Sequence, residues 1–452
     1  MRLYDIHYHA FDLSHANLIA FLSRDDLITA ETFESLMNKM PWYLKLAPLG
    51  VAQIRWVEKM MAEKVRTLIH ESGHIRSLLS VIENAIESHF LYIDYFLRNK
   101  QPFIGNPRKK DPGHTIQVDK LVICPLLMDF GYKNMGKQSQ FYNIPPGKPI
   151  VNQVVDIINA IYFYYHFEFL PADASWDQLK IAEIEYDPSS RFMEIFPFLG
   201  INTANYTLKQ VERLFEKYFE GFENDTHDSR KQKLLQKMGT LHMDITELSE
   251  KKSVLNTAEK IDFNYIFAGI KLYPPLGFDP WPEKDEEREK VELLYRKCLE
   301  KKIPITTHCS DGGFLTDENG KSYSNPAAHW KNVLSHKEFS NLKIDFAHFG
   351  SQSSGATEWK DTIIGYFKTN PNVYSDISCL ATKSEFYKSF KSYINPTTQD
   401  RFLFGSDFLI DMIWIDSYNN YLDLFIRDTN LDPPMKFKIS NENAERFLFG
   451  NV

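Results

Sequence analysis

Cysteine is scarce in this sequence. Its 452 residues include four cysteines, at positions 124, 298, 309 and 379, and they form no C-x-x-C pair. The disulfide scaffold of a small secreted domain needs a far higher density of cysteine. We therefore expect reduced thiols in a reducing compartment.

Long apolar runs and blocks of one charge are also missing. The most apolar stretch, 157–170, is interrupted by Asn159, His166 and Glu168, and a membrane span needs roughly 20 apolar residues. No apolar signal segment follows Met1, so we expect a cytoplasmic protein without a membrane partner. The formal net charge is -8 and no basic stripe occurs, so we do not expect nucleic acid as a partner.

The motifs of nucleotide chemistry are absent as well. The chain has neither a P-loop nor a G-x-G-x-x-G segment, and it lacks the G-x-S-x-G elbow of serine hydrolases. Hydrophobic residues make up 43% and charged residues 25%, which is ordinary globular usage. We expect a small-molecule substrate as the partner, and the sequence leaves a homo-oligomer open.

Short apolar segments alternate with helical patterns in the second half of the chain. In the clearest unit, a strand at 266–273 precedes a helix with Val291, Leu294, Tyr295 and Cys298 at spacings of three and four, and a strand follows at 303–309. This order predicts parallel strands joined by crossover helices. Further strands are expected at 342–348, 372–377 and 401–407, and upstream at 3–9, 121–128 and 192–201.

Eight strands are the number that closes a barrel. The predicted fold is therefore an α/β structure, a (β/α)8 TIM barrel formed by a single domain over residues 1–452. The connections at about 11–120 and 203–260 are too long for one crossover helix, so we expect helical insertions there. Residues 62–89 show helical spacing, residues 105–114 are expected to link back to the barrel, and an irregular segment at 142–149 precedes a helix at 151–165.

Two histidines lie two residues apart in the first predicted strand. Side chains alternate along a strand, so His7 and His9 point to the same side and can bind one metal ion. Taken alone, this H-x-H pattern is more typical of an ordinary pair in the core or at the surface.

Polar residues stand at the C-terminal ends of later strands, where the preceding residues are apolar. His308, His348 and Asp407 are predicted to end their strands. Catalytic groups of (β/α)8 barrels lie at this end, where residues far apart in sequence converge. We therefore expect these side chains to meet His7 and His9.

Lys271 alternates with apolar neighbours in its strand, and a buried lysine is costly unless it is paired. It fits a salt bridge to Asp407 or Asp5, a site for a substrate carboxylate, or a carbamylated lysine that bridges two metal ions. Cys309 and Ser406 adjoin His308 and Asp407, but neighbours on a strand face opposite ways. We therefore do not expect either to be a nucleophile.

Five motifs, taken in chain order, resemble the amidohydrolase superfamily. They are D-I-H-Y-H at 5–9, G-I-K-L at 269–272, T-H-C at 307–309, A-H-F-G at 347–350 and F-G-S-D at 404–407. The ending N-A-E-R-F at 443–447, followed by F-G at 449–450, looks similar too. The likeness is to the branch that includes amidohydrolase-related hydrolases and aminocarboxymuconate-semialdehyde decarboxylase.

The resemblance implies a metal site. Its ligands would be His7, His9, His308 and Asp407. His348 would be a catalytic or second-metal histidine, and Lys271 matches the strand-four position that is carbamylated in some members. One ion is more common in this branch, so we expect one Zn²⁺, with Mn²⁺ or Fe²⁺ as alternatives and a second ion if Lys271 is carbamylated.

The expected reaction is hydrolysis. A metal-activated water would attack a C–N, ester or lactone bond of a small molecule, with Asp407 and His348 as catalytic residues and Lys271 as a further candidate. Non-oxidative decarboxylation or hydration of an unsaturated or aromatic carboxylic acid is the alternative, and a non-catalytic barrel scaffold is the second. The loops at 274–282 and 310–330 are expected to shape the substrate site.

Overall fold

The computed structural model describes residues 1–12, 78, 81–82, 86–97, 118–129, 150–170, 180–241, 262–315, 319–383 and 385–450. The predicted linker at 105–114, the segment at 142–149 and most of the predicted helix at 62–89 lie outside these residues. So do most of the first expected insertion and residues 242–261 of the second. Among the described residues, no helix is both long and apolar enough to cross a bilayer.

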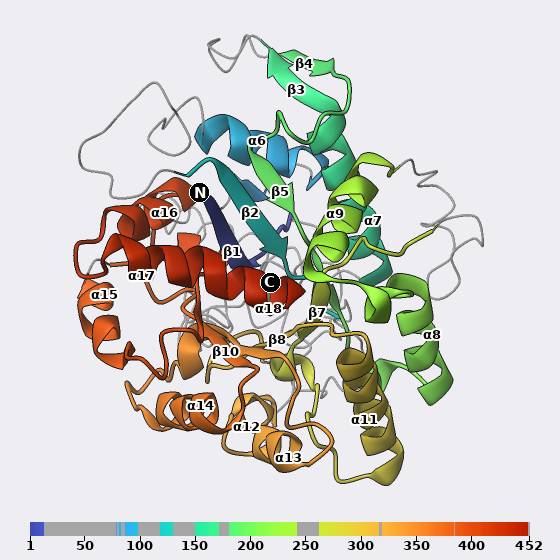
Figure 1. Ribbon diagram of the computed structural model, residues 1–452, viewed down its shortest axis with the longest axis vertical. Helices are drawn as coiled ribbons and strands as arrows, with labels where there is room; N and C mark the ends of the chain where they lie inside the picture. Colours follow the sequence, from blue (N-terminus) through green and yellow to red (C-terminus); the bar gives the residue numbers. More distant parts are fainter. Residues whose placement is uncertain are drawn as a thin grey trace, which may run out of the picture.

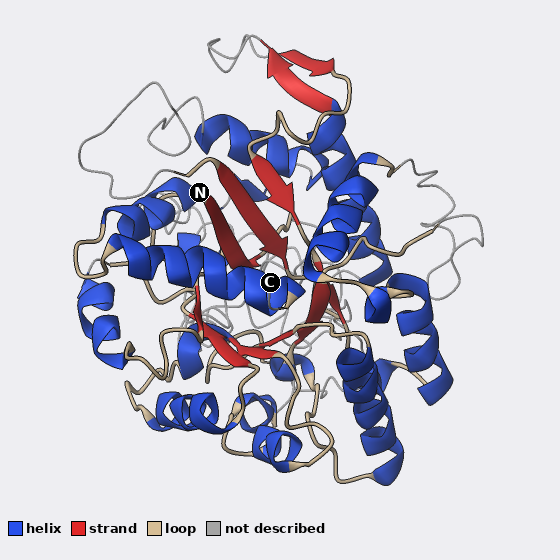
Figure 2. Ribbon diagram, viewed as in Figure 1, coloured by secondary structure: helices blue, strands red, loops and turns tan. Residues whose placement is uncertain are grey.

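Parallel strands occupy all eight predicted positions (Figure 2). In chain order they are β1 (Arg2–Tyr8), β2 (Lys120–Pro125), β5 (Met193–Ile195) with β6 (Phe198–Gly200), β7 (Gly269–Leu272), β8 (Ile305–Thr307), β9 (Ile344–Phe346), β10 (Val373–Asp376) and β11 (Phe402–Leu403). One sheet runs β1-β2-β5 and the other runs β11-β10-β9-β8-β7-β6. Residues 196–197 separate β5 from β6, so together these two fill the third strand position.

Backbone hydrogen bonds join the two sheets at both edges. The N–H of Leu127 donates to the carbonyl of Phe198 at 3.1 Å, which connects the end of β2 to β6. On the other side, the N–H of Ile6 donates to the carbonyl of Phe404 at 3.0 Å, which connects β1 to β11. The strands therefore form a closed ring, and the prediction of a (β/α)8 barrel is confirmed.

Helices surround this ring (Figure 1). They are α6 (His89–Tyr95), α7 (Ile150–His166), α8 (Leu208–Tyr218), α9 (His227–Gly239), α11 (Asp285–Glu300), α12 (Gly320–Ser324), α13 (His329–Ser335), α14 (Glu358–Thr369), α15 (Glu385–Phe390), α16 (Tyr418–Arg427), α17 (Pro433–Phe437) and α18 (Asn443–Phe449). The predicted stripe of α11 is buried as expected. Within the second expected insertion, α8 packs on α11, and α9 packs on α7 and α18.

The structure also contains an antiparallel hairpin that the sequence did not predict. It pairs β3 (Phe167–Leu170) with β4 (Lys180–Glu183) and projects beyond α6 at the edge of the molecule (Figure 1). Its first strand follows α7 without a break in the apolar pattern, so periodicity alone did not separate the two elements.

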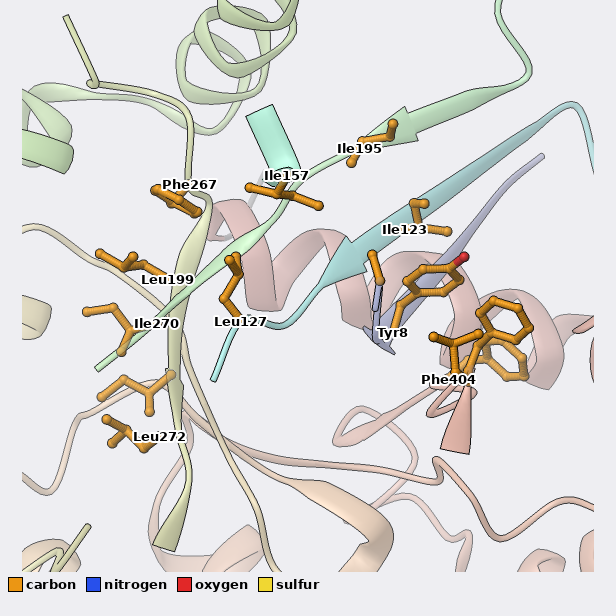
Figure 3. Close-up of a cluster of buried hydrophobic side chains, with 14 of the residues drawn as sticks. Tyr8, Ile123, Leu127, Ile157, Ile195, Leu199, Phe267, Ile270, Leu272 and Phe404 are labelled. Carbon is orange, nitrogen blue, oxygen red and sulfur yellow. The ribbon is translucent and has the colours of Figure 1, made fainter. Parts of the chain in front are cut away.

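Outward-facing apolar side chains of the strands form the core between the barrel and its helices. Figure 3 shows members of this cluster from β2, β5, β6 and β7 beside Ile157 of α7. Those from the strands include Ile123, Ile195, Leu199 and Ile270, each at most 1% exposed. This layer packs the helices against the strands, and a different set of residues fills the barrel interior.

The strand β1 carries a bulge just before its histidines. Asp5 pairs with Ile123, and the next pair joins Tyr8 to Pro125, so β1 uses one residue more than β2 over this step. An extra residue reverses the alternation of side chains between the two faces of the strand.

The bulge changes which residues of β1 face inward. Tyr4 and Ile6 belong to a buried cluster inside the barrel, together with residues such as Phe198 of β6. Beyond the bulge, it is His7 and His9 that face the interior. The N-terminal half of β1 therefore contributes to packing, and the C-terminal half carries chemically active groups.

Candidate metal centre

The structure brings the predicted site residues together at the C-terminal end of the barrel. His7 lies in β1, His9 and His308 directly follow β1 and β8, and Lys271 lies in β7. His348 and Asp407 complete the set, and each of the six residues is at most 5% exposed.

The strands predicted to end at His348 and Asp407 are shorter than expected. The strands end at Phe346 and Leu403, so His348 and Asp407 lie in the turns beyond them. Both residues have left-handed backbones, with φ values of 60° and 63°. This conformation is unfavourable for residues other than glycine, and such strain concentrates at functional sites. The turns direct these two side chains back over the barrel opening.

Asp407 is the centre of the cluster. Its Oδ1 lies 3.3 Å from Nε2 of His7 and 3.2 Å from Nε2 of His9. One potential ligand atom from each of His7, His348 and Asp407 lies within 4.8 Å of the others. These spacings suit donors that converge on one small cation.

The tautomers of His7 and His9 follow from the groups that contact their Nδ1 atoms. Nδ1 of His9 lies 3.1 Å from the carbonyl oxygen of Leu126, and Nδ1 of His7 lies 2.8 Å from Oδ2 of Asp376. A carbonyl can only accept, and so can an ionised carboxylate, so each Nδ1 carries the proton. Both Nε2 lone pairs then face the carboxylate of Asp407. A cation relieves that repulsion, so this donor set fits a metal ion.

His308 and His348 meet through their inner nitrogens, with Nδ1 of His308 3.1 Å from Nε2 of His348. The outer Nε2 of His308 contacts the carbonyl of Gly312 at 3.3 Å and the hydroxyl of Ser310 at 2.9 Å. When Nε2 holds the proton and donates to Gly312, the Nδ1 lone pair of His308 faces inward, toward Nε2 of His348. This arrangement again suits a cation bound between them.

The ionisation of these groups agrees with that role. Burial lowers the pKa of His7 to about 3, because it outweighs the attraction of nearby carboxylates. Burial and the neighbouring His348 lower the pKa of His308 well below its usual value. Burial raises the pKa of Asp407, but the hydrogen bond with His9 and the charges of nearby histidines outweigh it and hold that pKa far below normal. His7 and His308 are thus neutral beside an ionised carboxylate.

Lys271 does not make the salt bridge that was predicted as one of its roles. Its Nζ is buried and has no hydrogen-bond partner in the described part of the chain. Burial lowers its pKa to about 8, against the attraction of Asp376, Asp407 and Asp345. A buried amine of this kind is a candidate for modification or for contact with a substrate.

Four polar residues of the site were missed by the sequence analysis. Asp376 ends β10, Ser378 follows it, and Asp345 and Thr306 lie on the neighbouring strands β9 and β8. All four are fully buried. Charged residues inside apolar strands were a signal for Asp345 and Asp376, since such groups are rarely buried without a partner.

The two residues rejected as nucleophiles face away from the site. Cys309 lies in the outer core, where burial raises the pKa of its thiol well above normal. Ser406 donates its hydroxyl hydrogen to Oδ2 of Asp5 at 2.6 Å, on the outer side of β1. The strand alternation predicted both orientations correctly.

An apolar cluster flanks the histidines. It consists of Phe11, Met128, Tyr273, Leu276 and Phe314, which come from the segments after β1, β2, β7 and β8. The ring of Phe11 stacks on His9 with centroids 4.9 Å apart, and Tyr273 lies against His308 at the same distance. This cluster gives one side of the centre an aromatic wall.

Comparison with known proteins gives one family. Residues 258–450 match the model of the amidohydrolase family. No curated protein matches the chain. This segment contains Lys271, His308, His348, Asp376 and Asp407, whereas His7 and His9 lie outside it.

Two solved structures are similar at a low level. One is an uncharacterized TIM-barrel protein from Bordetella bronchiseptica, with 18% identity over 73% of this chain and 98% of that one, at a TM-score of 0.32. The other is an amidohydrolase from Mycobacterium avium subsp. paratuberculosis K-10, with 11% identity over 74% of this chain and 71% of that one, at a TM-score of 0.33. Likenesses this weak carry no weight for the assignment. The likeness to the amidohydrolase family therefore rests on residues 258–450, which are less than half of the chain.

Proposed function

We propose that this protein is a metal-dependent hydrolase that cleaves a C–N, ester or lactone bond of a small molecule. One observation carries the proposal: the Nε2 lone pairs of His7 and His9 face a single oxygen of Asp407, at 3.3 and 3.2 Å. His308 and His348 add two further nitrogens beside them. An assembly of lone pairs without protons between them is poorly stable unless it binds a cation.

The proposed ligands are His7, His9, His308 and Asp407. A divalent ion such as Zn²⁺, when bound by nitrogen and oxygen donors, lowers the pKa of water to roughly 7 and polarises a carbonyl group. The ion expected here is one Zn²⁺, with Mn²⁺ or Fe²⁺ as alternatives.

Asp407 and His348 are the proposed catalytic residues. As the water oxygen bonds to the carbonyl carbon, the carboxylate of Asp407 accepts a water proton and passes it to the leaving nitrogen or oxygen, whose bond to carbon breaks. His348, with Nδ1 held against Ser378, donates Nε2–H to the oxygen that becomes negative. The short contacts of His348 to Ser378 support this orientation.

Lys271 has two proposed roles. Carbamylation would convert its buried amine into a carboxylate-like ligand, and two ions would then be expected. Unmodified, its ammonium form could bind a substrate carboxylate, which favours non-oxidative decarboxylation of an unsaturated or aromatic acid as the second candidate. The aromatic wall of Phe11, Tyr273 and Phe314 suits the apolar body of such a substrate as well as that of a lactone.

A product assay on metal-loaded protein tests the proposal. Amides, lactones and aromatic or unsaturated carboxylic acids are incubated with the protein, and both acid release and carbon dioxide are measured. Hydrolysis predicts acid release without carbon dioxide, and decarboxylation predicts the reverse. A protein that binds no divalent ion would contradict both candidates.

A further inference from the structure

A buried serine lies between two of the site histidines. Ser378 follows β10 and is fully buried. Its Oγ lies 3.2 Å from Nδ1 of His7 and 2.9 Å from Nδ1 of His348. These two histidines are 341 residues apart in the sequence, so one hydroxyl connects opposite ends of the chain.

The single proton of this hydroxyl determines the direction of each bond. Oγ of Ser378 lies 2.5 Å from Oδ1 of Asp376, which also accepts the backbone N–H groups of Ser378 and His348 at 3.0 Å each. An oxygen that receives two backbone N–H groups acts as an acceptor, so the hydroxyl donates its proton to it. The lone pairs of Oγ are then left to accept Nδ1–H from His7 and His348.

The second oxygen of Asp376 completes the arrangement. Oδ2 accepts Nδ1–H of His7 at 2.8 Å, so Nδ1 of His7 contacts both Asp376 and Ser378. The backbone N–H of Asp376 donates to Oδ1 of Asp345 at 2.8 Å, and Oδ2 of Asp345 accepts the hydroxyl of Thr306 at 3.1 Å. The backbone of Asp376 is thus fixed to Asp345 of β9 and, through it, to Thr306 of β8.

We propose that Asp376 and Ser378 are positioning residues that hold Nδ1 of His7 and of His348, and so direct Nε2 of His7 toward the metal ion and Nε2 of His348 toward the substrate oxygen. The inference rests on the proposed metal-dependent function, because it assigns a purpose to the orientation of those two nitrogens. Asp376 has a further part, since it accepts the backbone N–H of His348 within the left-handed turn.

The same strand provides a matched control. Ser375 is also fully buried on β10, but its hydroxyl donates to the carbonyl of Phe346 at 2.5 Å and is not hydrogen-bonded to a histidine. Replacing it by alanine removes a buried hydroxyl without changing the outer partners of the site. A general packing effect would therefore appear in Ser375→Ala as strongly as in Ser378→Ala.

The test measures Co²⁺ affinity and the visible absorption of the Co²⁺-loaded protein, together with its melting curve. Parent protein, Ser378→Ala, Asp376→Asn and Ser375→Ala are compared by competition with a chelating dye. Loss of an outer partner of a metal-binding histidine costs roughly 10- to 100-fold in affinity. We expect a loss in that range for Asp376→Asn and Ser378→Ala, with a changed absorption band, and parent behaviour for Ser375→Ala.

Each contrary outcome has a distinct meaning. If the parent binds Co²⁺ and folded Ser378→Ala matches its affinity and absorption, the positioning role is wrong while the metal site stands. Equal weakening in Ser375→Ala would also overturn the role, because the effect would then come from packing. If the parent itself binds no Co²⁺, both the proposed function and this inference fail.

Discussion

The two ends of the barrel interior are built from the same strands but serve different purposes. The N-terminal end is filled by apolar side chains such as Tyr4, Ile6 and Phe198, and α18 closes it with Phe447. The C-terminal end is instead lined by histidine, aspartate and lysine side chains that are equally buried. The contrast indicates that the apolar N-terminal end contributes most of the stability. The polar C-terminal end contributes less, because its buried residues are suited to chemistry rather than to packing.

The largest effect on stability is expected at the apolar end. Phe447 is fully buried, and its ring lies 5.3 Å from that of Tyr374. Phe447→Ala should lower the free energy of unfolding by about 3–5 kcal/mol and leave metal affinity unchanged. Denaturant unfolding checks this against Phe437→Ala, whose parent side chain is 37% exposed and whose loss should cost less than about 0.5 kcal/mol. Loss of metal in Phe447→Ala would show that the two ends are not separate.

At the polar end, the reverse is expected of His348→Ala. Removing this imidazole should lower kcat by roughly 10²- to 10³-fold, because a group that stabilises developing charge is lost. Metal content and melting temperature should change little. Steady-state kinetics with elemental analysis checks the prediction, and the exposed His336→Ala is the control. If His348→Ala loses its metal, His348 is a ligand rather than an oxyanion donor.

A buried carboxyl group on the outer side of β1, that of Asp5, predicts a pH effect. Burial raises the pKa of Asp5 to about 7, although hydrogen bonds from Ser406 and Tyr418 oppose it. Between about pH 4 and 7 the unfolded chain has released this proton and the folded chain retains it, so stability falls as pH rises through this window. Relative to Asp5→Asn, the metal-free parent should lose on the order of a few kcal/mol across it. Parallel pH profiles of unfolding for the two proteins would contradict the assignment.

The smallest effect is expected from the aromatic wall. Phe314 belongs to the apolar cluster, and its N–H donates to the hydroxyl of Tyr273 at 3.0 Å. Phe314→Ala should raise KM roughly 10-fold for a substrate with an apolar body, while kcat and metal content stay close to those of the parent. A lower kcat with unchanged KM would place this residue in the chemical step instead.

Much of the fold could be predicted from the sequence, because apolar strands and amphipathic helices alternate with little ambiguity. All eight strand positions were correct, although the strands before His348 and Asp407 are shorter than predicted. The bulge in β1 was not predictable, since it depends on register with β2 rather than on any residue of its own. The β3–β4 hairpin was missed because its first strand continues the apolar pattern of α7.

The site was predictable to the extent that strand ends converge. His7, His9, His308, His348 and Asp407 were found from their positions, and the structure brings them together. The outer partners Asp376 and Ser378 could not be assigned, because hydrogen bonds between residues hundreds of positions apart leave no pattern in one sequence. The predicted salt bridge of Lys271 was wrong, since charge neutrality inside the barrel does not require direct contact.

Metal content is the most direct test of the account. Elemental analysis of protein purified without added metal compares the parent with His7→Ala and Asp407→Asn, and circular dichroism checks that each is folded. The account predicts about one equivalent of divalent metal in the parent and almost none in either variant. A folded parent that holds no metal even after supplementation, or variants that retain the parent amount, would contradict it.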